Sequence, residues 1–119
     1  NMAVIQTKVL KDRIKGDTFG SVNFIIENSL GAAIDLTGAT IKIQFRYRSK
    51  LGAIVRDMDI GTGITVPTPT NGILTIDAFE PIAYAIDTYF YDVEITFSDG
   101  RIKTYVQGTF KVLQDTTHS

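Results

Sequence analysis

The sequence contains no cysteine and no tryptophan, and its 119 residues include three prolines and one histidine. The absence of cysteine excludes disulfide bonds, thiolate metal ligands and cysteine nucleophiles. No apolar run approaches the roughly 18 residues of a membrane-spanning helix, so no membrane span is expected. Twelve basic and thirteen acidic residues give a net charge of −1, so neither a nucleic acid nor an anionic membrane surface is an expected partner.

Few residues offer catalytic or metal-binding chemistry. His118 lies next to the C-terminal residue, where no Ser-His-Asp arrangement can be built around it. The segment Asp57–Gly61 resembles the opening of a calcium loop, but its glycine comes one position early and Thr68 stands where a bidentate glutamate is required. Asp92 and Glu94 share one strand face and support a third-ranked hypothesis, a small hydrolase. We therefore expect a non-enzymatic protein, without cofactor and without catalytic, metal-binding or cofactor-binding residues.

The strongest pattern lies in residues 89–110, which we interpret as an antiparallel hairpin. Asp99-Gly100 is a preferred two-residue type I′ turn, and this turn fixes the pairing of both strands. The face predicted to be buried is mostly apolar and pairs Tyr89 with Phe110, Tyr91 with Gly108, Val93 with Val106, Ile95 with Thr104, and Phe97 with Ile102. The opposite face is mostly polar and pairs Phe90 with Thr109, Asp92 with Gln107, Glu94 with Tyr105, and Thr96 with Lys103.

Shorter strands are expected ahead of the hairpin. Residues 39–48 alternate cleanly between apolar and polar side chains, and weaker strands are predicted near 19–27, 51–58, 64–66 and 72–76. Residues 80–86 are predicted to form one short helix, because Pro81 is tolerated at a first helical position. This pattern favours an all-β fold, an immunoglobulin-like antiparallel β-sandwich of about seven to nine strands.

The chain is predicted to form a single domain over residues 1–119. Residues 1–15 are expected to form an edge strand or a mobile lead-in, because a short apolar run is followed there by four positive charges. Residues 113–119 are expected to form a C-terminal tail. Gly108 is expected either to receive the ring of Tyr91 from the opposite strand or to host a bulge.

The polar face of the hairpin carries the candidate interface. In such a sandwich, strand 39–48 lies beside strand 89–97, so Arg46 and Arg48 approach the acidic residues of the hairpin. A solvated sheet face is the ordinary interpretation of these charges. Phe90 and Tyr105 are aromatic residues on the same face, where they either mark an interface or are covered by a second layer such as the N-terminal segment; of the two we favour the interface. Phe90, Tyr105, Arg46 and Arg48 are therefore the possible interface residues.

Three passages carry a resemblance to a known family. They are Gly16–Phe19, Asp35–Ala39 with the alternation through 46, and Tyr89–Asp92 followed by 98–100, 104–108 and 115–117. In this order and spacing they resemble immunoglobulin-like structural domains of tailed bacteriophages and prophages, such as the N-terminal domain of the phage baseplate upper protein. The likeness spans residues 16–117. It implies a virion structural protein of the tail, baseplate or neck that catalyses nothing.

The resemblance also implies partners and a location. Other phage structural proteins and further copies of the chain are the expected partners, in a virion assembled in the cytoplasm of the bacterial host. The sequence lacks the long helical or receptor-binding continuation of the baseplate protein, so a fragment and a short stand-alone virion or neck protein both stay open. The alternative from another class is a carbohydrate-binding or adhesin module, in which Tyr84, Phe90 or Tyr105 serve as stacking platforms.

Overall fold

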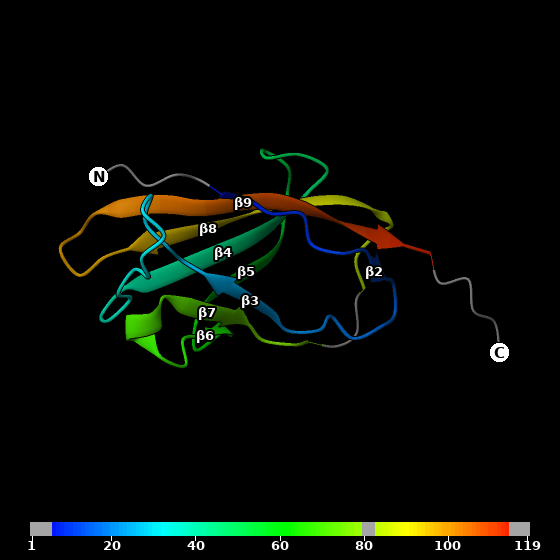
Figure 1. Cartoon of the computed structure of the whole chain (residues 1–119). Coiled ribbons are helices and arrows are strands. Elements are labelled where there is room, and N and C mark those ends of the chain that lie inside the picture. Colours follow the sequence, from blue (N-terminus) through cyan, green and yellow to red (C-terminus); the bar gives the residue numbers. More distant parts are fainter. Residues whose placement is uncertain (1–5, 80–82, 115–119) are drawn as a thin grey trace.

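The computed structural model describes residues 6–79 and 83–114, and their regular secondary structure is almost entirely β-strand. One sheet has the order β1-β9-β8-β4-β5-β6-β7-β3, with β2 also paired to β9. The sheet curls, so that β3, β6 and β7 lie across from β4, β8 and β9 (Figure 1). The predicted all-β class is confirmed. The strands are β1 (Gln6–Thr7), β2 (Arg13–Ile14), β3 (Val22–Ile25), β4 (Thr40–Tyr47), β5 (Ile54–Ile60), β6 (Gly63–Thr65), β7 (Ile73–Ile76), β8 (Asp87–Thr96) and β9 (Ile102–Leu113).

The sheet is mixed rather than antiparallel. β1 and β2 pair with β9 in parallel, and β5 pairs with β6 in parallel. The described part of the lead-in, residues 6–15, is therefore an edge element of the sheet, as one of the two alternatives predicted. It runs along β9 because the last strand of a sheet leaves an unpaired row of backbone groups. β9 itself extends to Leu113, one residue into the predicted tail.

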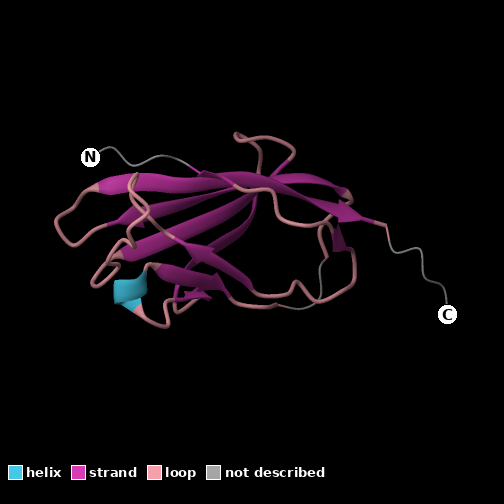
Figure 2. Cartoon of the chain, in the orientation of Figure 1, coloured by secondary structure: helices cyan, strands magenta, loops and turns pink. Residues whose placement is uncertain are grey.

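The expected helix before the hairpin is not found in the part that can be checked. Residues 80–82 lie outside the described residues, and 83–86 are not helical. The short helix of the described chain is instead a 3₁₀ turn, η1 (Pro69–Asn71) (Figure 2). Pro69 begins it, and Gly72 ends it with a φ of 69° and an N–H donated to the carbonyl of Pro69. This proline and glycine at the two ends explain why the turn forms there.

The hairpin has the predicted pairing in the half farther from the turn and a different pairing near the turn. Pairs from Tyr89 with Phe110 to Val93 with Val106 are as predicted. The turn, however, has three residues, because Phe97 N donates to the oxygen of Arg101 and Gly100 N donates to the oxygen of Phe97. Gly100 has a φ of 91°, whereas Asp99 does not have the positive φ that a type I′ turn requires.

A bulge between Val93 and Glu94 corrects the resulting offset of one residue. Glu94 therefore lies opposite Thr104 instead of Tyr105, and Ile95 lies opposite Lys103. For this reason the pairings predicted between the bulge and the turn are wrong. The extra residue on β9 is Tyr105, so both Tyr105 and its neighbour Val106 are buried.

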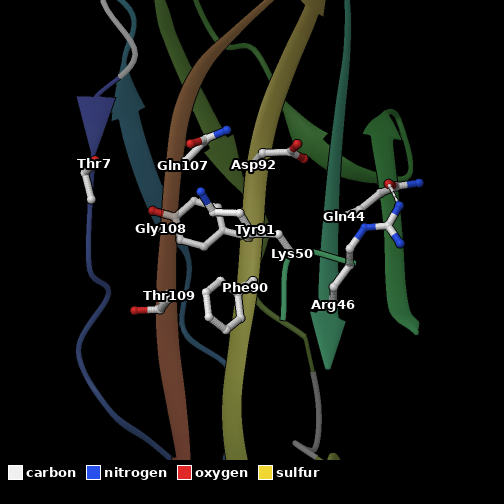
Figure 3. A pocket seen from close by; sticks show the side chains of 10 residues that line it. All are labelled: Thr7, Gln44, Arg46, Lys50, Phe90, Tyr91, Asp92, Gln107, Gly108 and Thr109. Atoms are coloured by element: carbon white, nitrogen blue, oxygen red, sulfur yellow. Dashed lines mark hydrogen bonds between the residues drawn. The ribbon is translucent and has the colours of Figure 1, made fainter. Parts of the chain in front are cut away.

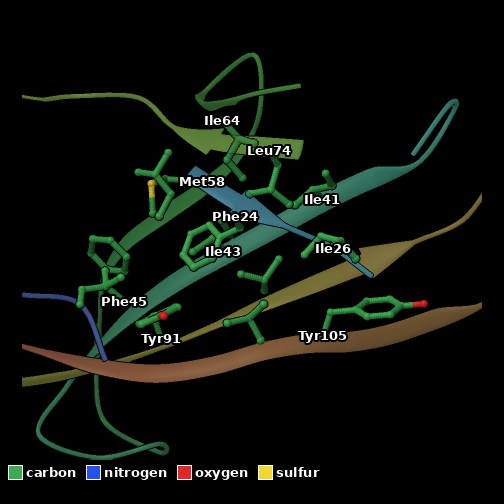
Figure 4. Packing of buried hydrophobic residues seen from close by; sticks show 14 of the residues in the cluster. Phe24, Ile26, Ile41, Ile43, Phe45, Met58, Ile64, Leu74, Tyr91 and Tyr105 are labelled. Atoms are coloured by element: carbon green, nitrogen blue, oxygen red, sulfur yellow. The ribbon is translucent and has the colours of Figure 1, made fainter. Parts of the chain in front are cut away.

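The core lies between the two halves of the curled sheet (Figure 4). The alternation in β4 and β8 buries Phe45, Tyr91 and the aliphatic residues between them, as predicted. Phe97 is only partly buried, and Ile102 is 62% exposed because the altered register turns it outward. The buried set is Leu10, Phe19, Phe24, Ile26, Leu36, Ala39, Ile41, Ile43, Phe45, Met58, Ile64, Leu74, Ile76, Tyr89, Tyr91, Val93, Ile95, Tyr105, Val106, Phe110 and Val112.

A stack of two arginines and two phenylalanines extends the aromatic part of this core. The rings of Phe19 and Phe79 are stacked with centroids 4.7 Å apart. The guanidinium of Arg13 lies 4.3 Å from the Phe19 centroid, and that of Arg56 lies 3.5 Å from the Phe79 centroid. Cation–π contacts of this kind stabilise charged groups that are partly removed from water. The stack thereby ties the N-terminal edge element to β5 through the two rings.

Two buried phenols predict a loss of stability at alkaline pH. Burial raises the pKa of Tyr89 to about 12, and its hydroxyl donates to the carbonyl of Ala85 at 2.6 Å. Burial also raises the pKa of Tyr91. The folded state holds these protons more tightly than the unfolded state, so its stability should fall as the pH rises above about 10. Melting curves between about pH 8 and about pH 11 should show this fall, and Tyr89→Phe should make it shallower. Equal slopes in both proteins would contradict the assignment.

Candidate functional site

The outer face of β4, β8 and β9 carries the residues that the sequence singled out. In the antiparallel pairing of β4 with β8, Arg46 lies opposite Phe90, Gln44 opposite Asp92, and Lys42 opposite Glu94. The prediction that strand 39–48 lies beside strand 89–97 is therefore confirmed. Of the four possible interface residues, the pairing brings together Phe90 and Arg46.

An open pocket of about 270 Å³ surrounds Phe90 on this face, and we call it the Phe90 pocket (Figure 3). β1 supplies one wall and the turn after β4 supplies another, so the pocket depends on three separate parts of the sequence. Its lining residues are Thr7, Gln44, Arg46, Lys50, Phe90, Tyr91, Asp92, Gln107, Gly108 and Thr109.

Hydrogen bonds hold the guanidinium of Arg46 in place at one side of the pocket. Its Nη1 donates to the carbonyl of Gly52 at 3.0 Å, and its Nη2 donates to Oε1 of Gln44 at 3.1 Å. Burial raises the pKa of the Asp92 carboxyl, and the charge of Arg46 opposes that shift. The wall that Gln44 and Arg46 form is therefore held in place by hydrogen bonds before any ligand binds.

Arg48 lies outside the pocket, in an ion pair. Its Nε donates to Oδ2 of Asp87 at 2.7 Å, while its side chain remains 68% exposed. The pKa of Asp87 is lowered, first by the backbone N–H of Thr88 and then by Arg48. The pKa of Arg48 is raised by the same bond and by the carboxylate charge. Arg48 is also the one described residue other than glycine with a positive φ, 69°.

Tyr105 is not on this face, so the prediction that it is an exposed interface residue is wrong. The bulge places it in the core, where it is 5% exposed. Its ring centroid lies 6.1 Å from that of Phe97. Tyr84 is partly buried and packs against Phe79 and Tyr89. Phe90 is partly buried as well, but of the three stacking platforms considered for a carbohydrate-binding module it is the one that lines the pocket.

The carboxylate pair considered for a hydrolase is divided between two hollows. Asp92 lines the Phe90 pocket, whereas Glu94 lines a second, open hollow with Lys42, Asp57 and Asp59. The segment that resembles a calcium loop lies in strand β5 up to Ile60, and Gly61 follows the strand. Within 6–79 and 83–114, no three acidic or histidine side chains are grouped to hold a metal ion. His118 lies outside the described residues.

An exposed apolar patch at the β4–β5 connection was not predicted. The loop projects from the sheet in Figure 1, and Leu51 in this loop is 94% exposed. Ile54 and Val55 at the start of β5 are 44% and 37% exposed. Together with Arg48 they form what we call the β4–β5 patch. A leucine beside Gly52 in a turn is the sequence signal that could have indicated it, because turns seldom need an apolar side chain.

Comparison with known proteins finds no matching family model and no matching curated protein. Among solved structures, the chain is similar to CopC from Methylosinus trichosporium OB3b, with a TM-score of 0.50 and 18% sequence identity. The match covers 91% of this chain and 89% of CopC. At this identity the likeness supports the β-sandwich-like fold alone.

Two further solved structures overlap less closely. The extracellular domains 3–5 of Drosophila OTK give a TM-score of 0.37 at 12% identity, covering 93% of this chain and 33% of that one. A family 123 glycoside hydrolase from Clostridium perfringens gives 0.38 at 14% identity, covering 92% and 23%. Both scores are too low to define a shared fold. No helix in the described part of the chain is long and apolar enough to cross a membrane.

Proposed function

We propose that this chain is a non-enzymatic structural protein of a bacteriophage or prophage virion, in the tail, baseplate or neck. It has an immunoglobulin-like arrangement of strands, assembles with other virion proteins and further copies of itself, and is incorporated in the cytoplasm of the bacterial host. The three sequence passages described above support the viral assignment. The exposed β4–β5 patch supports the protein–protein role.

The passages lie at turns that determine the fold. In the second passage, Oδ1 of Asp35 accepts hydrogen bonds from the backbone N–H and the hydroxyl of Thr37, and Gly38 has a φ of 74°. In the first passage, Phe19 is fully buried and bridges to Phe79. These residues are therefore explained by folding, and their common order supports a shared architecture rather than a shared active site.

The β4–β5 patch is the single observation that carries the assembly role. Large apolar side chains on a projecting loop cost free energy in water, and burial against a partner returns about 25 cal/mol per Å² of apolar surface. Arg48 at the end of the same loop is held in an ion pair with Asp87, so the apolar residues have a charged, hydrogen-bonded neighbour. An apolar centre with a charged rim is the usual composition of a protein interface.

Purified particles test this proposal. Virions from the phage or lysogen that encodes the chain should contain it in a fixed proportion to the tail proteins, measured by quantitative mass spectrometry. Lysine cross-linking in these particles should connect Lys50, on the projecting loop, to another virion protein. Lys111, exposed on β9, is the control position. A chain that stays in the particle-free fraction of the lysate would rule the proposal out.

A further inference from the structure

The Phe90 pocket combines an aromatic ring with hydrogen-bonding groups that have no partner in the described chain. The side chains of Gln107, Thr109 and Thr7 make no hydrogen bond within residues 6–79 and 83–114, and the Asp92 carboxylate accepts one from its own backbone N–H and none from another side chain there. Thr109 lies beside Phe90, the held guanidinium of Arg46 lies on the β4 side, and Asp92 and Gln107 form the next pair along β8 and β9 (Figure 3). Such unfilled groups on one side of a ring indicate a site for a ligand that is apolar on one side and polar at its edge.

We propose that the Phe90 pocket binds one sugar ring of a saccharide. A pyranose has a face of C–H groups and a rim of hydroxyls. The C–H face packs on the electron-rich face of an aromatic ring, as Phe90 offers. Each hydroxyl both donates and accepts, so it needs acceptors such as the Asp92 carboxylate and donors such as the Gln107 amide within reach. The pocket supplies both kinds around one ring.

A protein side chain fits the same pocket less well. An apolar anchor would cover Asp92 and Gln107 without replacing their hydrogen bonds to water, which is costly. Arg46, Lys50 and Asp92 put both signs of charge in the lining, so a side chain of either charge is attracted by one part of the pocket and repelled by another. A neutral polyhydroxylated ring avoids both penalties. The volume of about 270 Å³ is below that of sites for drug-sized ligands, which suits a single ring of a longer chain.

The inference goes beyond the assembly role and does not depend on it. The sugar is assigned to Phe90, Asp92 and Gln107, and assembly is assigned to Leu51, Ile54 and Val55. Lys50 lies on the same loop as Leu51 and also lines the pocket, so the two roles are tested at Phe90 and Gln107 on one side and at Leu51 on the other. Loss of sugar binding and loss of incorporation into particles are therefore separate results. A protein that binds a sugar but is absent from virions would support the pocket and refute the assembly role.

Titration of the ¹⁵N-labelled chain with simple sugars tests the pocket. Methyl α-D-glucoside, methyl β-D-galactoside, N-acetyl-D-glucosamine and L-rhamnose are added to millimolar concentration, with glycerol as the acyclic control. At least one sugar should cause saturable changes in the amide signals of Phe90, Asp92, Gln107 and Thr109. Glycerol should cause none, because it has no ring face to stack.

Variants of the chain then assign the binding to individual side chains. Phe90→Ala should weaken the binding at least about tenfold. Gln107→Ala should weaken it as well, and this variant keeps the test valid if Phe90→Ala does not fold. Ile102→Ala, at an exposed apolar residue of β9 outside the pocket, should bind as the parent does. The proposal is overturned if no sugar shifts these signals, if glycerol shifts them equally, or if Ile102→Ala loses binding as Gln107→Ala does.

Discussion

Phe45→Ala should destabilise the fold by about 3–5 kcal/mol, because it removes a large buried ring and leaves a cavity. Phe45 is fully buried at the centre of β4. Its ring centroid lies 4.8 Å from that of Phe110 and 5.5 Å from that of Phe19, so rings from both halves of the curled sheet lose a neighbour. A loss of this size consumes much of the stability of an ordinary domain. Equilibrium unfolding in urea measures it.

The control for this experiment is Ile102→Ala. Ile102 is 62% exposed, so its truncation should change the free energy of unfolding by less than about 0.5 kcal/mol. If Phe45→Ala unfolds at the same urea concentration as the parent, the inward face of β4 has been assigned to the wrong side.

Gly108→Ala should also destabilise the fold strongly, through the close packing of the N-terminal edge element. A methyl group on Gly108 would overlap the backbone carbonyl of Lys8 and lie 2.9 Å from Cε1 of Tyr91. The same carbonyl accepts a hydrogen bond of 2.7 Å from the Tyr91 hydroxyl. The methyl group would therefore push the N-terminal edge element away from β9, at a cost of about 1–3 kcal/mol.

Hydrogen exchange separates this effect from general destabilisation. The N–H groups of Lys8 and Leu10 donate to the carbonyls of Gln107 and Thr109. In Gly108→Ala their exchange should accelerate more than that of the β4 amides. Gly20→Ala is the matched control, because a methyl group there would meet no atom within 4 Å. Uniform acceleration in Gly108→Ala, or equal behaviour of both variants, would contradict the close packing of the edge element.

The sequence predicted the central strands because their side chains alternate. Residues 39–48 and the lower half of the hairpin have a clear period of two, and their pairing followed from it. The tight approach of Gly108 to the Tyr91 ring was one of two alternatives, and the ring contact is the one observed. The bulge, which was the other alternative for Gly108, lies nearer to the turn, between Val93 and Glu94.

The register near the turn could not be predicted from Asp99-Gly100 alone. The same pair fits a two-residue and a three-residue loop, and the choice depends on whether the strands can absorb an extra residue. Here they absorb it at Tyr105, whose ring gains burial in the core. The larger apolar burial of Tyr105 outweighs the regular pairing, and it removes this residue from the candidate interface.

Only some of the residues that line the pocket could be recognised from the sequence. Phe90 and Arg46 were recognised from the alternation of neighbouring strands, but two walls come from elsewhere. Thr7 arrives through the parallel pairing of β1 with β9, and Lys50 arrives through the β4–β5 turn. Neither a two-residue edge strand nor the direction of a loop leaves a periodic pattern, so these contributions required the structure.

Incorporation of Leu51→Asp into virions tests the central claim most directly, because it asks whether the exposed β4–β5 patch docks on another virion protein. Leu30→Asp is the matched control, since Leu30 is 82% exposed in a different loop. Particles grown with each variant are purified, and the amount of chain per tail is measured. We expect Leu51→Asp to be lost from the particles while Leu30→Asp is retained at the level of the parent. Retention of Leu51→Asp at that same level would contradict the account.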